Sequence, residues 1–442
     1  MRTFLSTISY SLIDMGRTTV FFMLTSMVVL VFLFIVALST TEGFAAHPFL
    51  YTYTLTVIVF QLSRIAAALL YKRSYDAAVT SMPYYGEYEP TVSFVIPCKN
   101  EEGAIRNTVE KCFAAQYPSY KLEVIVINDG STDRTIDILR ELKQERFPGL
   151  TIVDWKENKG KRHGMAEGFR RAKGDIVIQL DSDGYIDPKS LRAFVQPFRN
   201  RSIGAVCAHT DPANRDANWL TKMQAAYYFL AFRILKAAES TFLTVFCCCG
   251  CASAYRKDIV LPILDEWLLE TFLGKPISWD DDRALTNAIL RLGYNTIYAD
   301  TVQAFTIVPV KIMMFLKQQI RWKKGWLTGS LAASKFIWKQ RPFVAYSYFF
   351  PHVLFTLLTP FVTLRLLVLH PIMHESTPFL YIFGFLVYAA LVVLYYVQVA
   401  GAHMAFRYWP YVFVWSALSI ILLSFVFLYA ALTIQDRKWG TR

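Results

Sequence analysis

Long apolar runs lie at both ends of the chain, and a more polar region separates them. The runs cover residues 21–40, 50–70, 343–369, 378–400 and 408–433. Each has about the 20 residues that a helix needs to cross a bilayer core of roughly 30 Å. A cleaved leader is the alternative for the first run, but that run is longer than the apolar part of a leader, and a second run follows at once. We therefore expect membrane helices at both ends of the chain.

The topology of these runs leaves two questions open. Five crossings would place the C-terminus on the opposite side of the membrane from the central region. We therefore expect the run at 408–433 to be bent or re-entrant, which the basic Arg437-Lys438 favours, or the run at 343–369 to break near Pro351 or Pro360. Arg64 lies inside the second run, where its side chain either extends to the interface or lines a hydrated channel.

The central residues 87–310 have the pattern of a soluble α/β domain. Short apolar runs predict buried strands, and segments with helical spacing follow them. Strands are expected at residues 91–97, 122–128, 151–154 and 175–180, and helices at residues 101–115, 132–144, 163–172, 189–199 and 283–292. This alternation predicts a parallel sheet with helices on both faces, which binds ligands beyond the carboxyl ends of its strands.

Composition supports a membrane protein with a cytoplasmic centre. The 442 residues are 54% hydrophobic and carry a net charge of +12, with a mean hydropathy of +0.32. Positive charges lie beside the apolar runs, as Arg17, Lys72 and Arg73 do, and not in one nucleic-acid-binding patch. Because the loop 41–49 has no Lys or Arg, the positive-inside rule places the N-terminus and the centre in the cytoplasm.

The cysteines and glycines exclude several classes of site. All seven cysteines fall in the cytoplasmic part and are expected to be reduced thiols. Four of them crowd into Cys247-Cys248-Cys249-Gly250-Cys251, which lacks the paired spacing of a zinc site. No dinucleotide-binding or P-loop glycine motif follows a strand, which argues against a dehydrogenase or an ATPase.

Carboxylates follow two of the expected strands. Asp181 and Asp183 come after the fourth strand, where hard oxygen ligands suit Mg²⁺ or Mn²⁺ shared with a phosphate. An Asx-type turn is the alternative. Asp129 follows the second strand and can accept hydrogen bonds from a nucleobase or ribose, while Ser131 or Thr132 can cap the next helix.

Charged clusters lie at two expected helix starts. The basic segment at 158–163 enters a helix, where cations oppose the dipole unless an anion such as a diphosphate is bound. A solvated basic loop is the alternative. Asp280, Asp281 and Asp282 begin the helix at 283–292. The dipole alone favours acids there, but crowded carboxylates also invite the perturbed pKa that a general base needs.

Residues 313–338 combine an apolar face with Lys and Arg side chains, which predicts amphipathic helices in the membrane interface. This interpretation explains the basic residues. It does not explain the particular motif Gln318-x-x-Arg321-Trp322.

Together the motifs resemble the processive, membrane-embedded family 2 glycosyltransferases, and within them the bacterial hyaluronan synthases. The resemblance covers nearly the whole chain and rests on the joint order of segments 96–101, 128–131, 158–163, 181–183, 255–256, 271–276, 281–287, 318–322 and 439–442. It implies an α/β domain of the GT-A type, dominated by parallel strands and inserted between transmembrane helices. The expected parts are a membrane region at 1–73, a catalytic domain at 88–312, interface helices at 313–341, a membrane region at 342–434 and a gating segment at 435–442.

The resemblance also implies a role for each motif. Asp129 and Lys161 would hold a uridine diphosphate, and Asp181 and Asp183 would bind the nucleotide and Mg²⁺ or Mn²⁺. Asp282 would be the general base.

The other implied roles concern the acceptor and the leaving group. Asp281 would lie beside the base. Arg321, with Gln318 in the same motif, would hold the pyrophosphate, and Trp322 would line the acceptor site. The segment from Cys247 to Gly250 would form a priming loop, and that from Trp439 to Arg442 would close over the nucleotide.

The implied activity is inverting transfer from UDP-sugars to a growing β-linked polysaccharide that leaves through the enzyme's own channel. UDP-GlcNAc and UDP-GlcA are the expected donors, and membrane lipids are the other partners. A monomer in the plasma membrane, with no nucleic-acid partner, is expected.

Two departures concern the product. Asp280, after Trp279, stands where the family often has glycine or another small residue, and a Cys-rich turn at 249–252 leans toward chitooligosaccharide synthases that use UDP-GlcNAc alone. A non-processive transferase that makes a lipid-linked sugar would not account for the motif at 318–322. A transporter or receptor would not account for the carboxylates at 181–183 and 280–282.

Overall fold

The computed structural model describes residues 47–80, 88–277, 279–373, 379–400 and 402–436. The chain divides into two units. One contains Ala67–Thr221, Ala231–Val353 and Val426–Arg442, and the other contains Met1–Ala66, Lys222–Leu230 and Leu354–Phe425. The first unit holds the sheet and all the predicted site residues that the structure describes.

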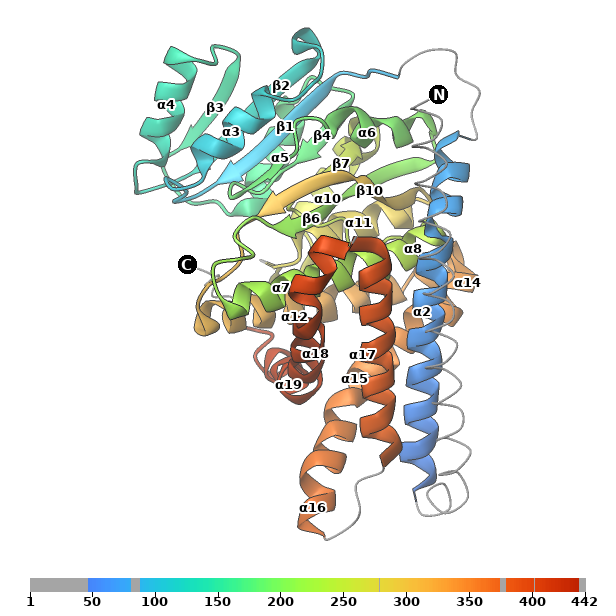
Figure 1. The fold of residues 1–442 in the computed structure, drawn as a ribbon. Coiled ribbons are helices and arrows are strands. Elements are labelled where there is room, and N and C mark those ends of the chain that lie inside the picture. The colour runs from blue at the N-terminus through green and yellow to red at the C-terminus, as the bar shows by residue number, and fades with distance from the viewer. Residues whose placement is uncertain (1–46, 81–87, 278, 374–378, 401, 437–442) are drawn as a thin grey trace, which may run out of the picture. The chain divides into compact units, whose positions relative to one another are not determined.

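An eight-stranded sheet is the centre of this unit, with the order β3-β2-β1-β4-β7-β6-β10-β5 (Figure 1). The strands are β1 (Val92–Cys98), β2 (Leu122–Asp129), β3 (Leu150–Trp155), β4 (Ile176–Gln179), β5 (Gly184–Ile186), β6 (Ile203–Pro212), β7 (Ser253–Arg256) and β10 (Asn295–Thr306). β1 to β4 are parallel, as predicted, and β6 is parallel to β10. β7 is antiparallel to both its neighbours, and β5 is antiparallel to β10. The sheet is therefore mostly parallel, which confirms the predicted fold class.

Helices connect the parallel strands and cover the sheet. They include α3 (Ile105–Phe113), α4 (Thr135–Glu145), α5 (Lys161–Arg171), α6 (Leu191–Val195) and, on either side of β10 in the chain, α11 (Asp281–Arg291) and α12 (Ile312–Ser334). α5 lies very close to β1, because a Cβ atom on Gly168 would come within 2.2 Å of Val95 Cγ1. This close packing fixes the position of Lys161, the first residue of α5.

The strands that the sequence did not predict lie after residue 183. β6 and β10 carry polar residues in their interiors, such as His209 and Gln303, and β7 has only four residues, of which the first is Ser253 and the last Arg256. A small hairpin of β8 (Thr271–Phe272) and β9 (Lys275–Pro276) precedes α11.

Three helical segments are long and apolar enough to cross a membrane in the part of the chain that the structure describes. They are Pro48–Val79, Pro342–Ile372 and Arg407–Leu432. The predicted run at 21–40 lies outside the described residues. The run at 343–369 does not break at Pro351 or Pro360, because the helix continues through π-helical turns at Ala345–Phe349 and Arg365–Leu369. The run at 408–433 is interrupted at Leu422, between α18 (Ala402–Ile421) and α19 (Leu423–Leu432).

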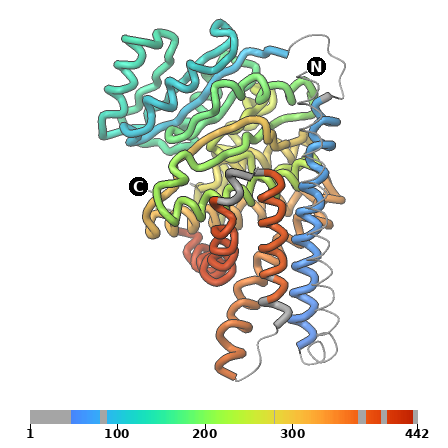
Figure 2. Tube along the Cα trace, viewed as in Figure 1, coloured from blue at the N-terminus to red at the C-terminus, as the bar shows by residue number. Residues whose placement is uncertain are grey.

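Helix α2 (Pro48–Thr80) begins in the second unit and packs there against two other helices. Gly384 of α17 (Phe379–Ala400) lies against Ile58, so the traces of the two helices run side by side in Figure 2. Leu50 and Tyr53 form a cluster with Val362 and Leu366. Close packing of apolar and small residues is what holds helices together within a bilayer.

Candidate active site

The predicted charged residues meet beyond the carboxyl ends of β2 and β4. Lys161 Nζ, at the start of α5, lies 2.7 Å from Asp181 Oδ1. The pair is largely shielded from solvent, with side-chain exposures of 23% and 27%. Burial opposes the charge on Lys161, but the carboxylates of Asp181, Asp282 and Asp281 raise its pKa above the usual value. The lysine is therefore charged, and its ammonium group interacts with several carboxylates at once.

Asp282 is held in this group by hydrogen bonds to both of its carboxylate oxygens. Gln179 Nε2 donates to Oδ1 at 3.2 Å, and the backbone N–H of Gly250 donates to Oδ2 at 2.7 Å. Burial, together with the nearby carboxylates of Asp181 and Asp281, raises the pKa of Asp282 to about 6, and Lys161 partly offsets the rise. An oriented carboxylate whose pKa is close to neutral has the properties of a general base.

Asp281 points into a different environment. Its Oδ1 accepts a hydrogen bond from Arg162 Nε at 3.1 Å, and both side chains are buried, with exposures of 5% and 6%. Arg162 also donates to the carbonyl oxygen of Trp267 at 3.0 Å and stacks over its ring. Asp281 therefore links the start of α11 to α5. Its role as a neighbour of the general base stays a prediction.

The segment from Cys247 to Cys251 lines the site with its backbone. A Cβ atom on Gly250 would lie 2.8 to 2.9 Å from Gln179 Nε2, Asp181 Oδ1 and Lys161 Nζ, so any other residue would displace the polar ends of these site side chains. The carbonyl oxygen of Gly250 also accepts from the N–H of Asp181 at 3.0 Å.

This segment is anchored by groups that the sequence did not single out. Thr286 Oγ1 accepts from the N–H of Cys248 at 2.9 Å and donates to the carbonyl oxygen of Asp282 at 2.7 Å. The half-buried Lys236 donates to the carbonyl oxygen of Cys247. Thr286 thus links the segment to α11 one turn after Asp282.

Cysteine side chains of this segment pack against other thiols of the chain. Cys248 and Cys207 are fully buried, and the Sγ atoms of Cys207 and Cys249 are 3.7 Å apart. No group of three or more His, Cys, Asp or Glu side chains is arranged for a metal ion among the described residues.

Asp129 organises the basic loop that precedes α5. Its carboxylate accepts from the N–H groups of Lys159 at 2.6 Å and Gly160 at 2.9 Å, and the residue is buried. The alternative that Ser131 or Thr132 caps α4 is wrong. The N-cap position of this helix is Arg134, and the residue before it, Asp133, accepts a hydrogen bond on Oδ1 from the N–H of Thr135, the first residue of the helix, at 3.0 Å.

Asp181 and Asp183 fit a divalent cation. The pKa of the Cys251 thiol is raised by its hydrogen bond with Cys249, by burial, and by the carboxylates of Asp181 and Asp183, so both carboxylates lie near the same thiol. Carboxylates two residues apart in one loop supply hard oxygen ligands, and a phosphate supplies the others that Mg²⁺ or Mn²⁺ requires.

The motif at residues 318–322 lies on α12, which packs against α11. Gln318, Trp322, Gly325 and Gly329 share one face of this helix by their spacing, and the two glycines contact α11. Within the described residues, Gln318 Oε1 is buried and has no hydrogen-bond partner. The predicted residues Trp439 and Arg442 lie outside the described residues.

Several residues at the site were missed by sequence reasoning. Gln179 gave a usable signal, because it is a lone polar residue at the end of an otherwise apolar strand. Its Oε1 has no hydrogen-bond partner within the described residues and remains available as an acceptor. Arg162 and Thr286 lay in recognised motifs without an assigned role, and Lys236 lay in no motif.

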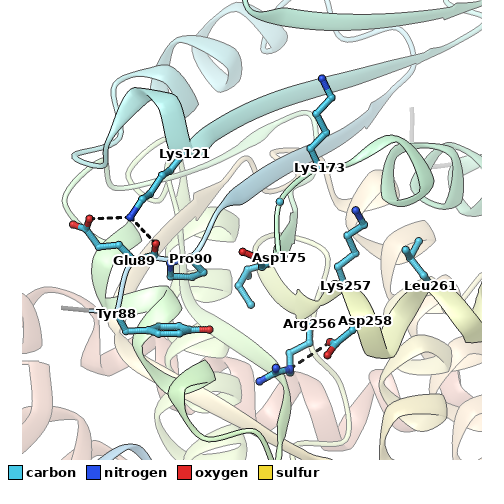
Figure 3. A pocket seen from close by; sticks show the side chains of 12 residues that line it. Tyr88, Glu89, Pro90, Lys121, Lys173, Asp175, Arg256, Lys257, Asp258 and Leu261 are labelled. Carbon is cyan, nitrogen blue, oxygen red and sulfur yellow. Dashed lines mark hydrogen bonds and ion pairs between the residues drawn. The ribbon is translucent and has the colours of Figure 1, made fainter. Parts of the chain in front are cut away.

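A separate cavity of about 560 Å³ opens at the other edge of the sheet (Figure 3). It lies at the amino ends of β1, β2 and β4 and contains none of the predicted site residues. Two of its charged pairs are matched within the protein: Lys121 pairs with Glu89 at 3.4 Å, and Arg256 pairs with Asp258 at 3.4 Å.

Comparison with known proteins gives consistent matches. The profile of Glycosyl transferase family 2 matches residues 93–263. A hyaluronan synthase of Streptococcus pyogenes serotype M1 is 31% identical over 408 residues, which are 88% of this chain and 90% of that protein. An N-acetylglucosaminyltransferase of Azorhizobium caulinodans is 30% identical over 359 residues, 80% of this chain and 87% of that protein.

The fold also matches a solved structure. A mannosyltransferase of Pyrobaculum calidifontis, solved with GDP-mannose and Mn²⁺, superimposes with a TM-score of 0.55 at 20% identity and covers 87% of this chain and 99% of that one. At this identity the likeness concerns the fold alone.

Proposed function

Starting from the premise that this chain belongs to the family 2 glycosyltransferases, we propose that it polymerises hyaluronan from UDP-GlcNAc and UDP-GlcA and secretes the polymer through its own membrane helices. The similarity to the streptococcal hyaluronan synthase, which spans nearly all of that protein, is the observation that carries this proposal. Chitooligosaccharide synthesis from UDP-GlcNAc alone is the second candidate. The N-acetylglucosaminyltransferase of Azorhizobium caulinodans and the Cys-rich segment favour it.

The geometry supports an inverting mechanism with Asp282 as the base. Gln179 and the Gly250 N–H hold both oxygens of its carboxylate, so the remaining lone pairs have a fixed direction. Asp282 removes the proton from the acceptor hydroxyl as this oxygen attacks the anomeric carbon. The C–O bond to the diphosphate breaks in the same step, so an α-linked donor gives a β-linked product.

Positive charge in this mechanism acts on the leaving diphosphate. Lys161 supplies it from the start of α5, where the helix dipole also favours an anion, and Arg321 supplies it from α12. Asp181 and Asp183 would hold a divalent cation, which would supply further positive charge to the leaving diphosphate. Asp129 keeps the loop before Lys161 in place through its two backbone hydrogen bonds.

For the membrane, we infer a multi-pass arrangement with the sheet-containing unit in the cytoplasm. The apolar helical segments support it, and so does the lack of Lys and Arg in the loop 41–49. The polymer would leave between these helices.

The product can be tested with purified enzyme, Mn²⁺ and defined donors. We expect long polymer only when UDP-GlcNAc and UDP-GlcA are both present, and we expect hyaluronan lyase, but not chitinase, to degrade it. Chitinase-sensitive chains from UDP-GlcNAc alone would support the second candidate. A single sugar attached to a lipid would overturn both.

The rate of transfer should depend on pH through Asp282. Its pKa is raised to about 6, and only the unprotonated form accepts a proton, so kcat/KM is expected to fall about tenfold per pH unit below that value and to level off above it. The measurement is UDP release between pH 5 and 8, with UDP binding followed in parallel as a control for folding. A rate that stays constant down to pH 5 would show that Asp282 is not the titrating base.

A further inference from the structure

Helices α11 and α12 meet at a contact built on two glycines. Asp280 and Arg283 lie over Gly325 and Gly329, and Asn287 Nδ2 donates to the carbonyl oxygen of Gly329 at 2.9 Å. A Cβ atom on Gly325 would lie 3.0 Å from Asp280 Cβ and 3.1 Å from its Oδ1. The two helices are therefore as close as these side chains permit.

Asp280 is unusual in this contact. Its φ is 82°, in the left-handed region that favours glycine. Its side chain is only 8% exposed, and its Oδ1 lies 3.8 Å from Arg283 Nε. The backbone conformation alone therefore does not explain why this position holds an aspartate.

The contact lies between the two helices that carry the proposed base and the proposed diphosphate-binding arginine. Asp282 lies on α11, two residues after Asp280. Arg321 lies on α12, one turn before Gly325. A change in the spacing of the helices would therefore move the diphosphate group relative to the base.

We propose that Asp280 is a positioning residue whose side chain, seated between Gly325 and Gly329, sets α12 and its Arg321 at the correct distance from Asp282. The expected effect on catalysis rests on the proposed glycosyltransferase function. The packing of Asp280 against the two glycines does not depend on that function.

A double-mutant cycle tests the contact, because the three atoms nearest to a Cβ on Gly325 all belong to Asp280. Gly325→Ala in the native background is expected to lower kcat about tenfold, with a smaller change in the KM for UDP-sugar, because small displacements of positioned groups are costly. In the Asp280→Gly background the added methyl group has room, so Gly325→Ala is expected to change kcat less than about threefold.

Gly329→Ala is the matched control. The three atoms nearest to its Cβ are Arg283 Cδ at 2.2 Å, Asp280 Oδ2 at 2.5 Å and Arg283 Cγ at 2.7 Å, and Asp280→Gly removes only the second of them. Most of the defect of Gly329→Ala should therefore persist in both backgrounds. Asp280→Asn keeps the shape and tolerates the left-handed backbone, so it should retain more than about a third of kcat, whereas Asp280→Gly should fall about tenfold.

The outcomes separate the two proposals. Equal losses from Gly325→Ala in both backgrounds would overturn the positioning role, as would a loss of folded protein with unchanged kcat per folded enzyme. If the native protein transfers sugar from none of the UDP-sugars tested, the proposed function is overturned instead. The helix contact is then tested by thermal unfolding, in which Gly325→Ala must lower the midpoint temperature only when Asp280 is present.

Discussion

Asp282→Asn is expected to lower sugar transfer by about a thousandfold or more while leaving UDP binding within about threefold of the native value, because losing a general base typically costs 10²–10⁴ in rate. Asparagine has the same shape and can still accept from the Gly250 N–H, which lies 2.7 Å from Oδ2. It cannot take up the proton of the acceptor hydroxyl. The defect should therefore appear in the chemical step and not in donor binding.

The measurement combines UDP release, polymer length and calorimetric UDP binding. Asp265→Asn is the control, because the Asp265 side chain is 87% exposed and pairs with Arg170 of α5 at the surface. It should transfer sugar at the native rate. If Asp282→Asn elongates polymer at more than a few per cent of the native rate, another group must be the base.

Sequence reasoning located Asp129, Asp181 and Lys161 because each follows or begins a strongly patterned element. Apolar runs predicted β2 and β4, and side chains after parallel strands meet at one edge of the sheet. These residues do come together there, as the 2.7 Å distance between Lys161 and Asp181 shows. Local pattern therefore predicted the position of the site.

The residue pattern by itself did not separate Asp281 from Asp282, and only the family resemblance assigned them different roles. Adjacent residues at a helix start point about 100° apart, and only the packed structure shows that one faces Arg162 and the other faces Gln179 and Gly250. Gln179 and the contact between α11 and α12 depend on partners far along the chain, such as Asp282 and Gly325. Such pairs have no local signature in a single sequence.

Lys161→Met is expected to lower kcat/KM at pH 7 about a hundredfold and to move the acidic limb of the pH profile to higher pH. Lys161 opposes the rise in the pKa of Asp282 that burial and the carboxylates of Asp181 and Asp281 produce. Without this cation the pKa of Asp282 rises further, so a larger fraction of the base is protonated at neutral pH. The diphosphate also loses a positive charge.

Lys161→Arg separates the two effects of the lysine, because it keeps the charge while changing the shape of the group. The acidic limb of this variant should stay within a few tenths of a pH unit of the native profile, even if its kcat is lower. If Lys161→Met loses activity with an unmoved acidic limb, the lysine acts on the donor alone. If the limb moves in both variants, the 2.7 Å geometry with Asp181 Oδ1, and not the charge alone, sets the pKa of the base.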